Sequence, residues 1–281
     1  MSSLAALRSL LFVPGTRPDR FEKALNSGAD AIVIDLEDAV EPERKAEARQ
    51  LVGTFLEGIG DTSSAILVRI NAAGSEWIDD DCDWIRDFAV DGIVFPKAES
   101  PESIDAVASV VRDGAVLPLL ETSRAILLAP EILAARADMP AVLFGAEDLT
   151  AELGIPRTLA GEELLYARSR VVLAAATIGA DPIDAVWVDI NNTEGLRTDA
   201  ARAKALGFRG KMAIHPDQVS AINEAFSPTS EEIASARKIV DAAERASADG
   251  EAAFRFENKM VDAPVIKRAQ LVLERAARAR G

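Results

Sequence analysis

Cysteine and histidine are nearly absent from this sequence, which contains one of each, Cys82 and His215. A single cysteine excludes an intrachain disulfide. This fits a reducing compartment, so we expect a cytoplasmic protein. Cys82 lies between Asp81 and Asp83, whose charges disfavour the thiolate that a nucleophilic cysteine requires. A single histidine excludes metal sites built from several histidines and leaves at most one for catalysis.

Basic residues are scarce relative to acidic ones: 31 lysines and arginines stand against 46 aspartates and glutamates, a net charge of −15. Nucleic acids and anionic membranes repel such a chain, so we expect neither as a partner. No apolar run reaches transmembrane length. The run near the first residue lacks a basic start and a small-residue cleavage site, so we expect a first strand there. An anionic ligand therefore requires a local basic or backbone-amide site.

The chain also lacks a G-x-G-x-x-G motif after its first apolar run, which weakens the case for an open doubly wound sheet. Short apolar runs, each predicted to be a strand, occupy residues 9–14, 31–36, 65–70, 92–96, 116–121, 141–145, 185–190 and 211–215. Helical patterns between them include residues 17–28, 42–60, 101–114, 161–180 and 193–207. Eight strands alternating with helices predict an α/β protein with a (β/α)₈ barrel over residues 1–226.

The barrel pattern ends near Phe226. A helix with a clear capping sequence is predicted from residue 227 to 250, followed by an irregular piece at 251–264 and a final helix. Residues 227–281 are therefore predicted to form a small helical C-terminal module.

Acidic residues follow two neighbouring strands, and in a barrel the chemistry collects at these carboxyl ends. Glu121 ends the fifth predicted strand and Asp148 follows the sixth. Because adjacent strands lie about 4.8 Å apart, both acids can bind one hard cation. Oxygen ligands favour Mg²⁺, with Mn²⁺ as the alternative, and with water and substrate oxygens completing the shell. The other interpretation is that either acid pairs with Arg69, Lys97 or Arg124.

Arg69 ends the third predicted strand, where a guanidinium suits a carboxylate or a developing enolate oxygen. The alternative is a local salt bridge to Glu37 or Asp38. These two acids are predicted to orient metal-bound water or the arginine. His215 follows the eighth strand and is either a general base or, as we favour, a hydrogen-bonded residue of the rim.

Several segments together carry a family resemblance over about residues 8 to 220. They are SLLFVPGTRPDRFEKALNSGADAIVIDLEDAV, LVRIN, VFPKAES, LLETSRAILLAPEI, FGAEDLTAELG and KMAIHPDQV. This set resembles the citrate lyase beta-subunit-like family of the HpcH/HpaI aldolase superfamily. That family includes malyl-CoA, β-methylmalyl-CoA and citramalyl-CoA lyases.

The resemblance implies a Mg²⁺-dependent barrel that handles an acyl-CoA and a 2-oxoacid and forms a homotrimer or hexamer. It places the metal ligands at Glu121 and Asp148 and the substrate-binding arginine at Arg69. Glu37 and Asp38 match its acid pair. The oxoacid carboxylate would bind the loop formed by Gly145, Ala146, Glu147 and Asp148. Coenzyme A is expected to contact Pro14, Gly15, Arg17, Arg20 and Lys97, with Arg17 at a turn and helix start that suit phosphate.

The segment ENKMVDAPVIKRA resembles the C-terminal motif of malyl-CoA and citramalyl-CoA lyases. The resemblance implies that Asp262 acts as a catalytic base in a neighbouring subunit's site. The alternative is that Asp262 caps the last helix, ahead of Pro264.

The predicted activity is a reversible retro-Claisen cleavage of a β-hydroxyacyl-CoA, of the malyl-, methylmalyl- or citramalyl-CoA type, to a 2-oxoacid and a short acyl-CoA. Four alternatives stay open. They are a β-hydroxyacyl-CoA thioesterase, a citrate lyase beta subunit of an acyl-carrier-protein complex, a class II 2-oxoacid aldolase without CoA, and a non-enzymatic scaffold. One methyl group changes binding by only about 1–3 kcal/mol, so the pattern does not select one acid.

Overall fold

The computed structural model describes residue 4 and residues 6–111, 114–248, 253–257 and 259–278. The chain divides into two compact units, Met1–Phe226 and Ser227–Gly281. None of the helices in the described ranges is long and apolar enough to cross a membrane.

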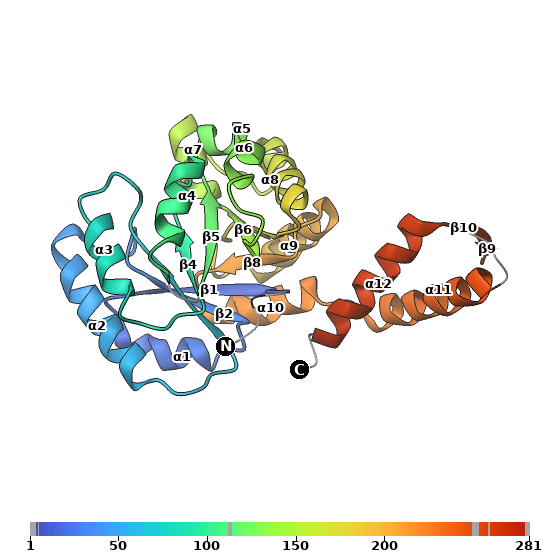
Figure 1. The fold of residues 1–281 in the computed structure, drawn as a ribbon, viewed down its shortest axis with the longest axis horizontal. Helices are drawn as coiled ribbons and strands as arrows, with labels where there is room; N and C mark the ends of the chain where they lie inside the picture. The colour runs from blue at the N-terminus through green and yellow to red at the C-terminus, as the bar shows by residue number, and fades with distance from the viewer. Residues whose placement is uncertain (1–3, 5, 112–113, 249–252, 258, 279–281) are drawn as a thin grey trace. The chain divides into compact units, whose positions relative to one another are not determined.

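Parallel strands of the first unit close into a barrel, as Figure 1 shows. The strands are β1 (Ser9–Pro14), β2 (Ala31–Asp35), β3 (Ala65–Arg69), β4 (Gly92–Phe95), β5 (Ala115–Leu120), β6 (Ala141–Phe144), β7 (Asp181–Asp184) and β8 (Gly210–Ala213). Each strand pairs with the next along the chain, and β1 closes the barrel on β8. The predicted (β/α)₈ barrel is confirmed.

Helices cover the outside of the barrel. They are α1 (Phe21–Leu25), α2 (Lys45–Gly58), α3 (Ile78–Ile85), α4 (Pro101–Ala108), α5 (Ser123–Leu127), α6 (Ala129–Leu133), α7 (Ala146–Leu153), α8 (Leu165–Ile178), α9 (Thr193–Leu206) and α10 (Pro216–Phe226). Several begin just after a strand. Thr122, for example, accepts a hydrogen bond from the Ala125 amide and caps α5, so the chain turns directly after Glu121.

The strand residues alternate between two apolar layers, one inside the barrel and one between barrel and helices. The inner layer contains Leu10, Ala31, Val33, Ala65, Leu67, Val94, Leu117, Leu119, Ala141, Leu143, Ile183 and Met212. Two positions beyond Val33 and Leu67, the same inward face carries Asp35 and Arg69, which are register partners. The alternation therefore points polar side chains into the carboxyl mouth of an apolar barrel.

The seventh strand is not where the sequence predicted it. Residues 185–190 were expected to form it because they are apolar, but β7 is the preceding segment DPID, and residues 185–189 have no strand partner. Aspartate and proline disfavour strands. Here Asp184 is fully buried and bonds Arg168 and Lys211. These tertiary contacts outweigh the local preference, and the strand ends at Asp184 instead of Asp189.

The second unit contains α11 (Ser230–Ala248) and α12 (Ala263–Arg278), which pack against each other. Between them lies an antiparallel pair, β9 (Phe254–Phe256) and β10 (Lys259–Val261). The prediction that residues 251–264 are irregular was wrong for these two strands. They are three residues long, too short to show a clear period in the sequence.

Candidate active site

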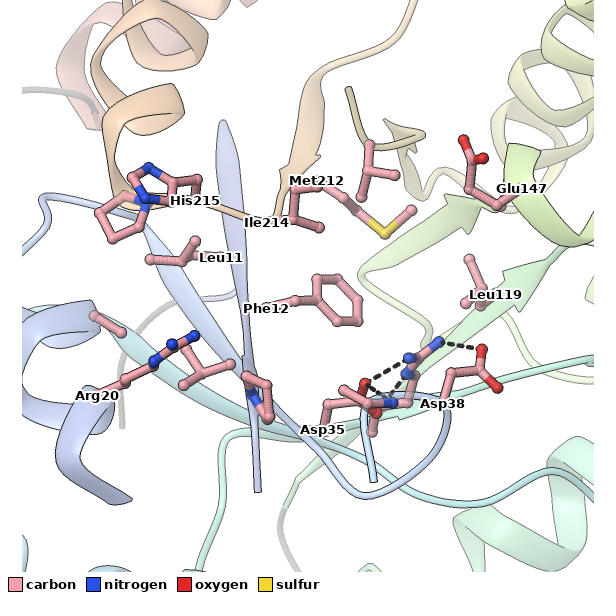
Figure 2. Close-up of a pocket in the computed structure, with 18 of the residues that line it drawn as sticks. Leu11, Phe12, Arg20, Asp35, Asp38, Leu119, Glu147, Met212, Ile214 and His215 are labelled. Atoms are coloured by element: carbon pink, nitrogen blue, oxygen red, sulfur yellow. Dashed lines mark hydrogen bonds and ion pairs between the residues drawn. The ribbon is translucent and has the colours of Figure 1, made fainter. Parts of the chain in front are cut away.

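A cavity of about 780 Å³ opens at the carboxyl ends of the barrel strands. Its wall includes apolar side chains such as Leu11, Phe12 and Met212 and the strand-end residues Arg69 and Glu121. Figure 2 shows Arg20 and His215 on one side, Glu147 on the other and Phe12 between them. The volume suits a small organic ligand, and enzymes of this fold bind substrate at this face.

Several contacts hold the side chain of Arg69 in the cavity wall. Its Nε and Nη2 donate to the two carboxylate oxygens of Asp35 at 2.7 and 2.6 Å, and its guanidinium lies over the Phe12 ring. Burial disfavours its charge, but Asp35 and the neighbouring Glu37 outweigh this and raise the pKa of Arg69. Burial also opposes the charge of Asp35, yet Arg69 holds the pKa of Asp35 below its usual value. The pair is therefore a fixed cation at the mouth.

Two acids of the β2 end also face Arg69. Its Nη1 lies 2.9 Å from Glu37 Oε2 and 3.5 Å from Asp38 Oδ2. Glu37 is buried, and desolvation raises its pKa although Arg69 and Lys97 oppose the rise. Lys97 donates to the other Glu37 oxygen at 2.8 Å and lies 3.0 Å from Asp148 Oδ2. The sequence left open whether Arg69 forms a salt bridge with Glu37 or Asp38. In the structure Arg69 lies near both, and its bidentate partner is Asp35.

Glu121 lies at the centre of the acidic group. It is 4% exposed, and its Oε1 accepts a hydrogen bond from the Lys97 amide at 2.9 Å. Burial raises its pKa to about 8, with further increases from Glu37 and Asp148 that Arg69 and Lys97 only partly offset. Gly145 makes room for it, because a Cβ there would lie 2.5 Å from the Glu121 Cβ. The negative charge at this point is therefore incompletely balanced by protein cations.

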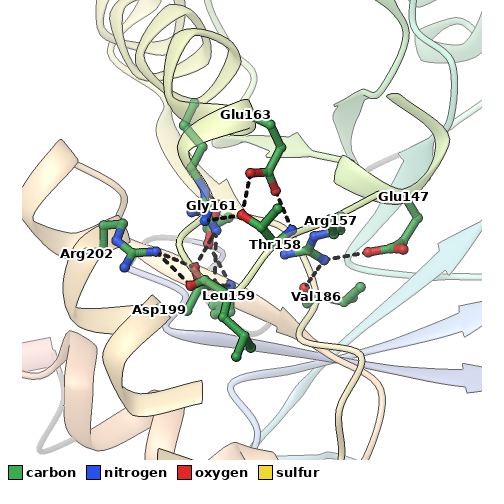
Figure 3. Close-up of polar contacts among 12 residues, drawn as sticks. Glu147, Arg157, Thr158, Leu159, Gly161, Glu163, Val186, Asp199 and Arg202 are labelled. Carbon is green, nitrogen blue, oxygen red and sulfur yellow. Dashed lines mark hydrogen bonds and ion pairs between the residues drawn. The ribbon is translucent and has the colours of Figure 1, made fainter. Parts of the chain in front are cut away.

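The cavity wall at β6 is the start of α7. Gly145 has an extended conformation and Asp148 lies in the first turn, whose amides have no acceptor within the helix. Glu147 accepts a hydrogen bond from Arg157, which also donates to the carbonyl of Val186 (Figure 3). Because Glu147 and Val186 both line the cavity, Arg157 links two of its walls.

Basic side chains gather at the opposite rim. Arg20 and Lys23 are exposed and line the cavity. Arg17 does not line it and instead pairs with Asp19. His215 is half-exposed at the rim, and its Nδ1 accepts from the Asp217 amide at 3.3 Å, as we favoured.

Most of the predicted site residues come together at this cavity. Those that line it are Pro14, Arg20, Asp38, Arg69, Glu121, Gly145, Ala146, Glu147 and Asp148. Glu37 and Lys97 do not line the cavity, but each contacts a residue that does: Glu37 contacts Arg69, and Lys97 contacts Asp148. Sequence reasoning missed Asp35, although the inward alternation Val33–Asp35 beside Leu67–Arg69 was a usable signal. It also missed Lys23 and Arg157, which no spacing pattern marked.

The acidic group suits a divalent cation. Within the described ranges, no group of three or more histidine, cysteine, aspartate or glutamate side chains is arranged to hold a metal. Glu121 and Asp148 place two carboxylates at the cavity, and Mg²⁺ is commonly bound through one or two carboxylates plus water and substrate oxygens. The raised pKa of buried Glu121 indicates a site where added positive charge is favourable. These residues fit Mg²⁺.

Comparison with known proteins agrees with this geometry. The family model for HpcH/HpaI aldolase/citrate lyase matches residues 8–216. The chain belongs to this family. A citrate lyase subunit beta-like protein of Deinococcus radiodurans is 40% identical, over 97% of this chain and 98% of the relative. The mitochondrial citramalyl-CoA lyase of Rattus norvegicus is 30% identical, over 95% of this chain and 85% of the relative.

A solved structure is also similar along the whole chain. CitE from Mycobacterium tuberculosis in complex with magnesium, acetoacetate and coenzyme A has a TM-score of 0.83 and 35% identity, covering 98% of this chain and all of that one. The family resemblance and the assignment of the chain as a lyase-type enzyme are confirmed. The expected ligands, Mg²⁺ and coenzyme A, are those found in that structure.

Asp262 belongs to the second unit. It is exposed, and its Oδ1 accepts a hydrogen bond from the Val265 amide at 3.3 Å. Asp262 therefore caps α12, the alternative that the sequence left open. One capping oxygen leaves the other available, so its catalytic role stays a prediction.

Proposed function

We propose that this protein is a Mg²⁺-dependent acyl-CoA lyase that reversibly cleaves a β-hydroxyacyl-CoA into a 2-oxoacid and a short acyl-CoA. The observation that carries the proposal is the position of buried Glu121, which shares one barrel mouth with Asp148 and with the fixed cation Arg69. Two acids for a metal and one guanidinium for an oxyanion are what this cleavage requires.

Glu121 and Asp148 would hold the metal ion. When bound, Mg²⁺ would polarise the hydroxyl and carboxylate oxygens of the substrate and so favour loss of the hydroxyl proton. Glu37 would keep Lys97 and Arg69 in place through its two oxygens, which lie 2.8 and 2.9 Å from their nitrogens. Mn²⁺ is the alternative metal, because it accepts the same oxygen donors.

Arg69 would stabilise negative charge that develops as the carbon–carbon bond breaks. Asp35 accepts from its Nε and Nη2, and Glu37 lies 2.9 Å from Nη1. The remaining N–H groups of Nη1 and Nη2 would face the thioester enolate or oxoacid oxygen. Because the Arg69–Asp35 pair is already held in place and buried, Arg69 is a preorganised donor for the negative charge of the transition state. Asp38 would assist by orienting the guanidinium, since it lies 3.5 Å from Nη1.

The first turn of α7 would bind the oxoacid carboxylate. The amides of Ala146, Glu147 and Asp148 lie at the N-terminus of α7, the end of a helix that favours negative charge. Gly145 lets the backbone approach closely. A second anionic group, the CoA phosphates, would bind across the cavity at Arg20 and Lys23, with Pro14 and Gly15 forming the adjacent turn.

Asp262 would exchange the proton of the acyl methyl carbon and act as base in the condensation direction. Since it lies in the second unit, we propose that a homotrimer or hexamer brings it to the cavity of a neighbouring subunit. Its exposure and its place in the motif ENKMVDAP support this role.

The test is a substrate panel. Malyl-CoA, methylmalyl-CoA and citramalyl-CoA are each incubated with Mg²⁺ or with EDTA, and release of the 2-oxoacid is followed. We expect release from at least one thioester with Mg²⁺ and none with EDTA. Release of free CoA without oxoacid would instead support the thioesterase, and EDTA-resistant cleavage would contradict the proposal.

A second candidate is the beta subunit of a citrate lyase complex. It is favoured by the 40% identity to the citrate lyase subunit beta-like protein of Deinococcus radiodurans. Such a chain would act on a thioester of an acyl-carrier protein. Cleavage of carrier-bound substrate only, with no turnover of free acyl-CoA, would support this candidate.

A further inference from the structure

Lys97 has a backbone conformation that calls for an explanation. It follows β4 and Pro96, and its φ is 47°, in the left-handed region that residues other than glycine rarely adopt. Such strain persists only where the surrounding structure imposes it, and it concentrates at functional sites. The question is what this conformation provides.

The conformation allows one residue to contact three acids from three strand ends. The Lys97 amide donates to Glu121 Oε1 at 2.9 Å. The ammonium donates to Glu37 Oε1 at 2.8 Å and lies 3.0 Å from Asp148 Oδ2. An amide and an ammonium of one residue thus converge on both carboxylates of the proposed metal site.

We propose that Lys97 is a built-in counter-cation that tunes the affinity of this site for Mg²⁺. The Lys97 amide orients Glu121. Its ammonium competes with the metal ion for Asp148 and, because both are positively charged and close together in a partly buried site, it repels the metal ion. Lys97 is thus a positioning and tuning residue. The inference rests on the proposed metal site and names the residue that limits its affinity for Mg²⁺.

The same residue was predicted from the sequence to bind coenzyme A phosphate, and the geometry favours a different role. The Lys97 side chain is 36% exposed, and both of its charged contacts are with acids that belong to the barrel mouth. By contrast, Arg20 and Lys23 line the cavity from the opposite rim. A phosphate role for Lys97 would require it to leave two carboxylates.

The test is calorimetric titration of Mg²⁺ into the full-length, EDTA-treated protein without substrate. Lys97→Met removes the charge and keeps the length of the side chain, so we expect Mg²⁺ to bind about tenfold more tightly. Lys97→Arg keeps the charge and should bind Mg²⁺ nearly as the unaltered protein does. Lys97→Gly removes the charge and also relieves the backbone, and it should share the tighter binding even if Lys97→Met folds poorly.

The outcomes separate this inference from the metal site itself. Measurable Mg²⁺ binding by the unaltered protein with unchanged or weaker binding by the Met and Gly variants would overturn the inference only. Absence of Mg²⁺ binding by the unaltered protein would overturn the proposed metal site, and with it the inference. A raised KM for the CoA thioester with unchanged Mg²⁺ affinity would return Lys97 to the phosphate role.

Discussion

At the scale of the residue, the site depends on how closely its charged groups are held. Asp35 takes two of the donors of Arg69, and Gly145 leaves the space that Glu121 occupies. Neither Asp35 nor Gly145 is expected to contact the reacting atoms. Their effect is to define where the guanidinium and the buried carboxylate stand, and errors of an ångström at such positions are costly.

Gly145→Ala should weaken the proposed Mg²⁺ site. The new Cβ would lie 2.5 Å from the Glu121 Cβ and 2.6 Å from Oε2, so the carboxylate must move. We expect a loss of at least about tenfold in Mg²⁺ affinity, measured by calorimetry. Gly58→Ala, at the end of α2 with nothing within 4 Å of its Cβ, is the control for an added methyl group, and equal losses in both variants would contradict the explanation.

Glu121 should also make the metal-free protein less stable as the pH rises. Its pKa in the folded protein is about 8, above the ordinary 4.5, so the folded state holds this proton more tightly than the unfolded state. The stability it contributes is complete below 4.5 and is lost as the pH rises through 8, by about 1.4 kcal/mol per pKa unit.

Urea unfolding in EDTA, over a range of about pH 5 to 9, provides the measurement. The free energy of unfolding should fall with pH more steeply in the unaltered protein than in Glu121→Gln, where this group no longer titrates. Parallel curves would show that Glu121 ionises in the folded protein with its ordinary pKa.

At the scale of the element, a buried ionic cluster fixes the position of β7. Arg168 of α8 and Lys211 of β8 bond Asp184 of β7 and Asp199 of α9, and all four side chains are at most 4% exposed. The cluster joins two strands to two helices. It explains why the unpromising segment DPID forms a strand while the apolar run after it does not.

Lys211→Met should therefore destabilise the barrel strongly. It leaves two buried carboxylates with Arg168 as their remaining buried partner, and breaking a buried ion pair from one side costs about 3–5 kcal/mol. Arg197→Met is the matched control, because Arg197 pairs with Glu224 on the surface and such pairs contribute less than about 1 kcal/mol. Urea unfolding compares the two, and a similar small loss in both would be evidence against the cluster's role.

At the scale of the whole molecule, the proposed role of Asp262 in a neighbouring subunit's site would require more than one copy of the chain. Asp262 lies in the Ser227–Gly281 unit, whereas Glu121 and Arg69 lie in the barrel. If a neighbouring subunit supplies the base, a chain that lacks Asp262 and a chain that lacks Glu121 can together form an active site in one assembly.

Mixing Asp262→Asn with Glu121→Gln should restore activity that neither variant has alone. In a mixed trimer, an intact cavity can receive an intact Asp262 from another chain, so about a quarter or less of the activity should return after the subunits are exchanged by unfolding and refolding. Oxoacid release measures it. Mixed assemblies that stay inactive, while each variant still assembles, would mean that Asp262 acts within its own chain or not at all.

Particular residues show how far the sequence could go. The position of Glu121, Asp148 and Arg69 at one cavity could be predicted, because parallel strands bring their carboxyl ends to one edge. Asp35 was missed as part of the site because its role depends on register with Arg69. The left-handed conformation of Lys97 could not be predicted either, because nothing in the segment PKAES distinguishes this lysine from an ordinary exposed one.

Chain periodicity alone was enough to specify the barrel, because eight apolar runs spaced by helical patterns have few other ways to bury their surfaces. The same holds for the set of strand-end acids, which follows from the order of residues along each run. Only the tertiary structure decided the position of the seventh strand and the partners of each charge. Those depend on contacts between residues far apart in the chain, where desolvation and pairing outweigh local preference.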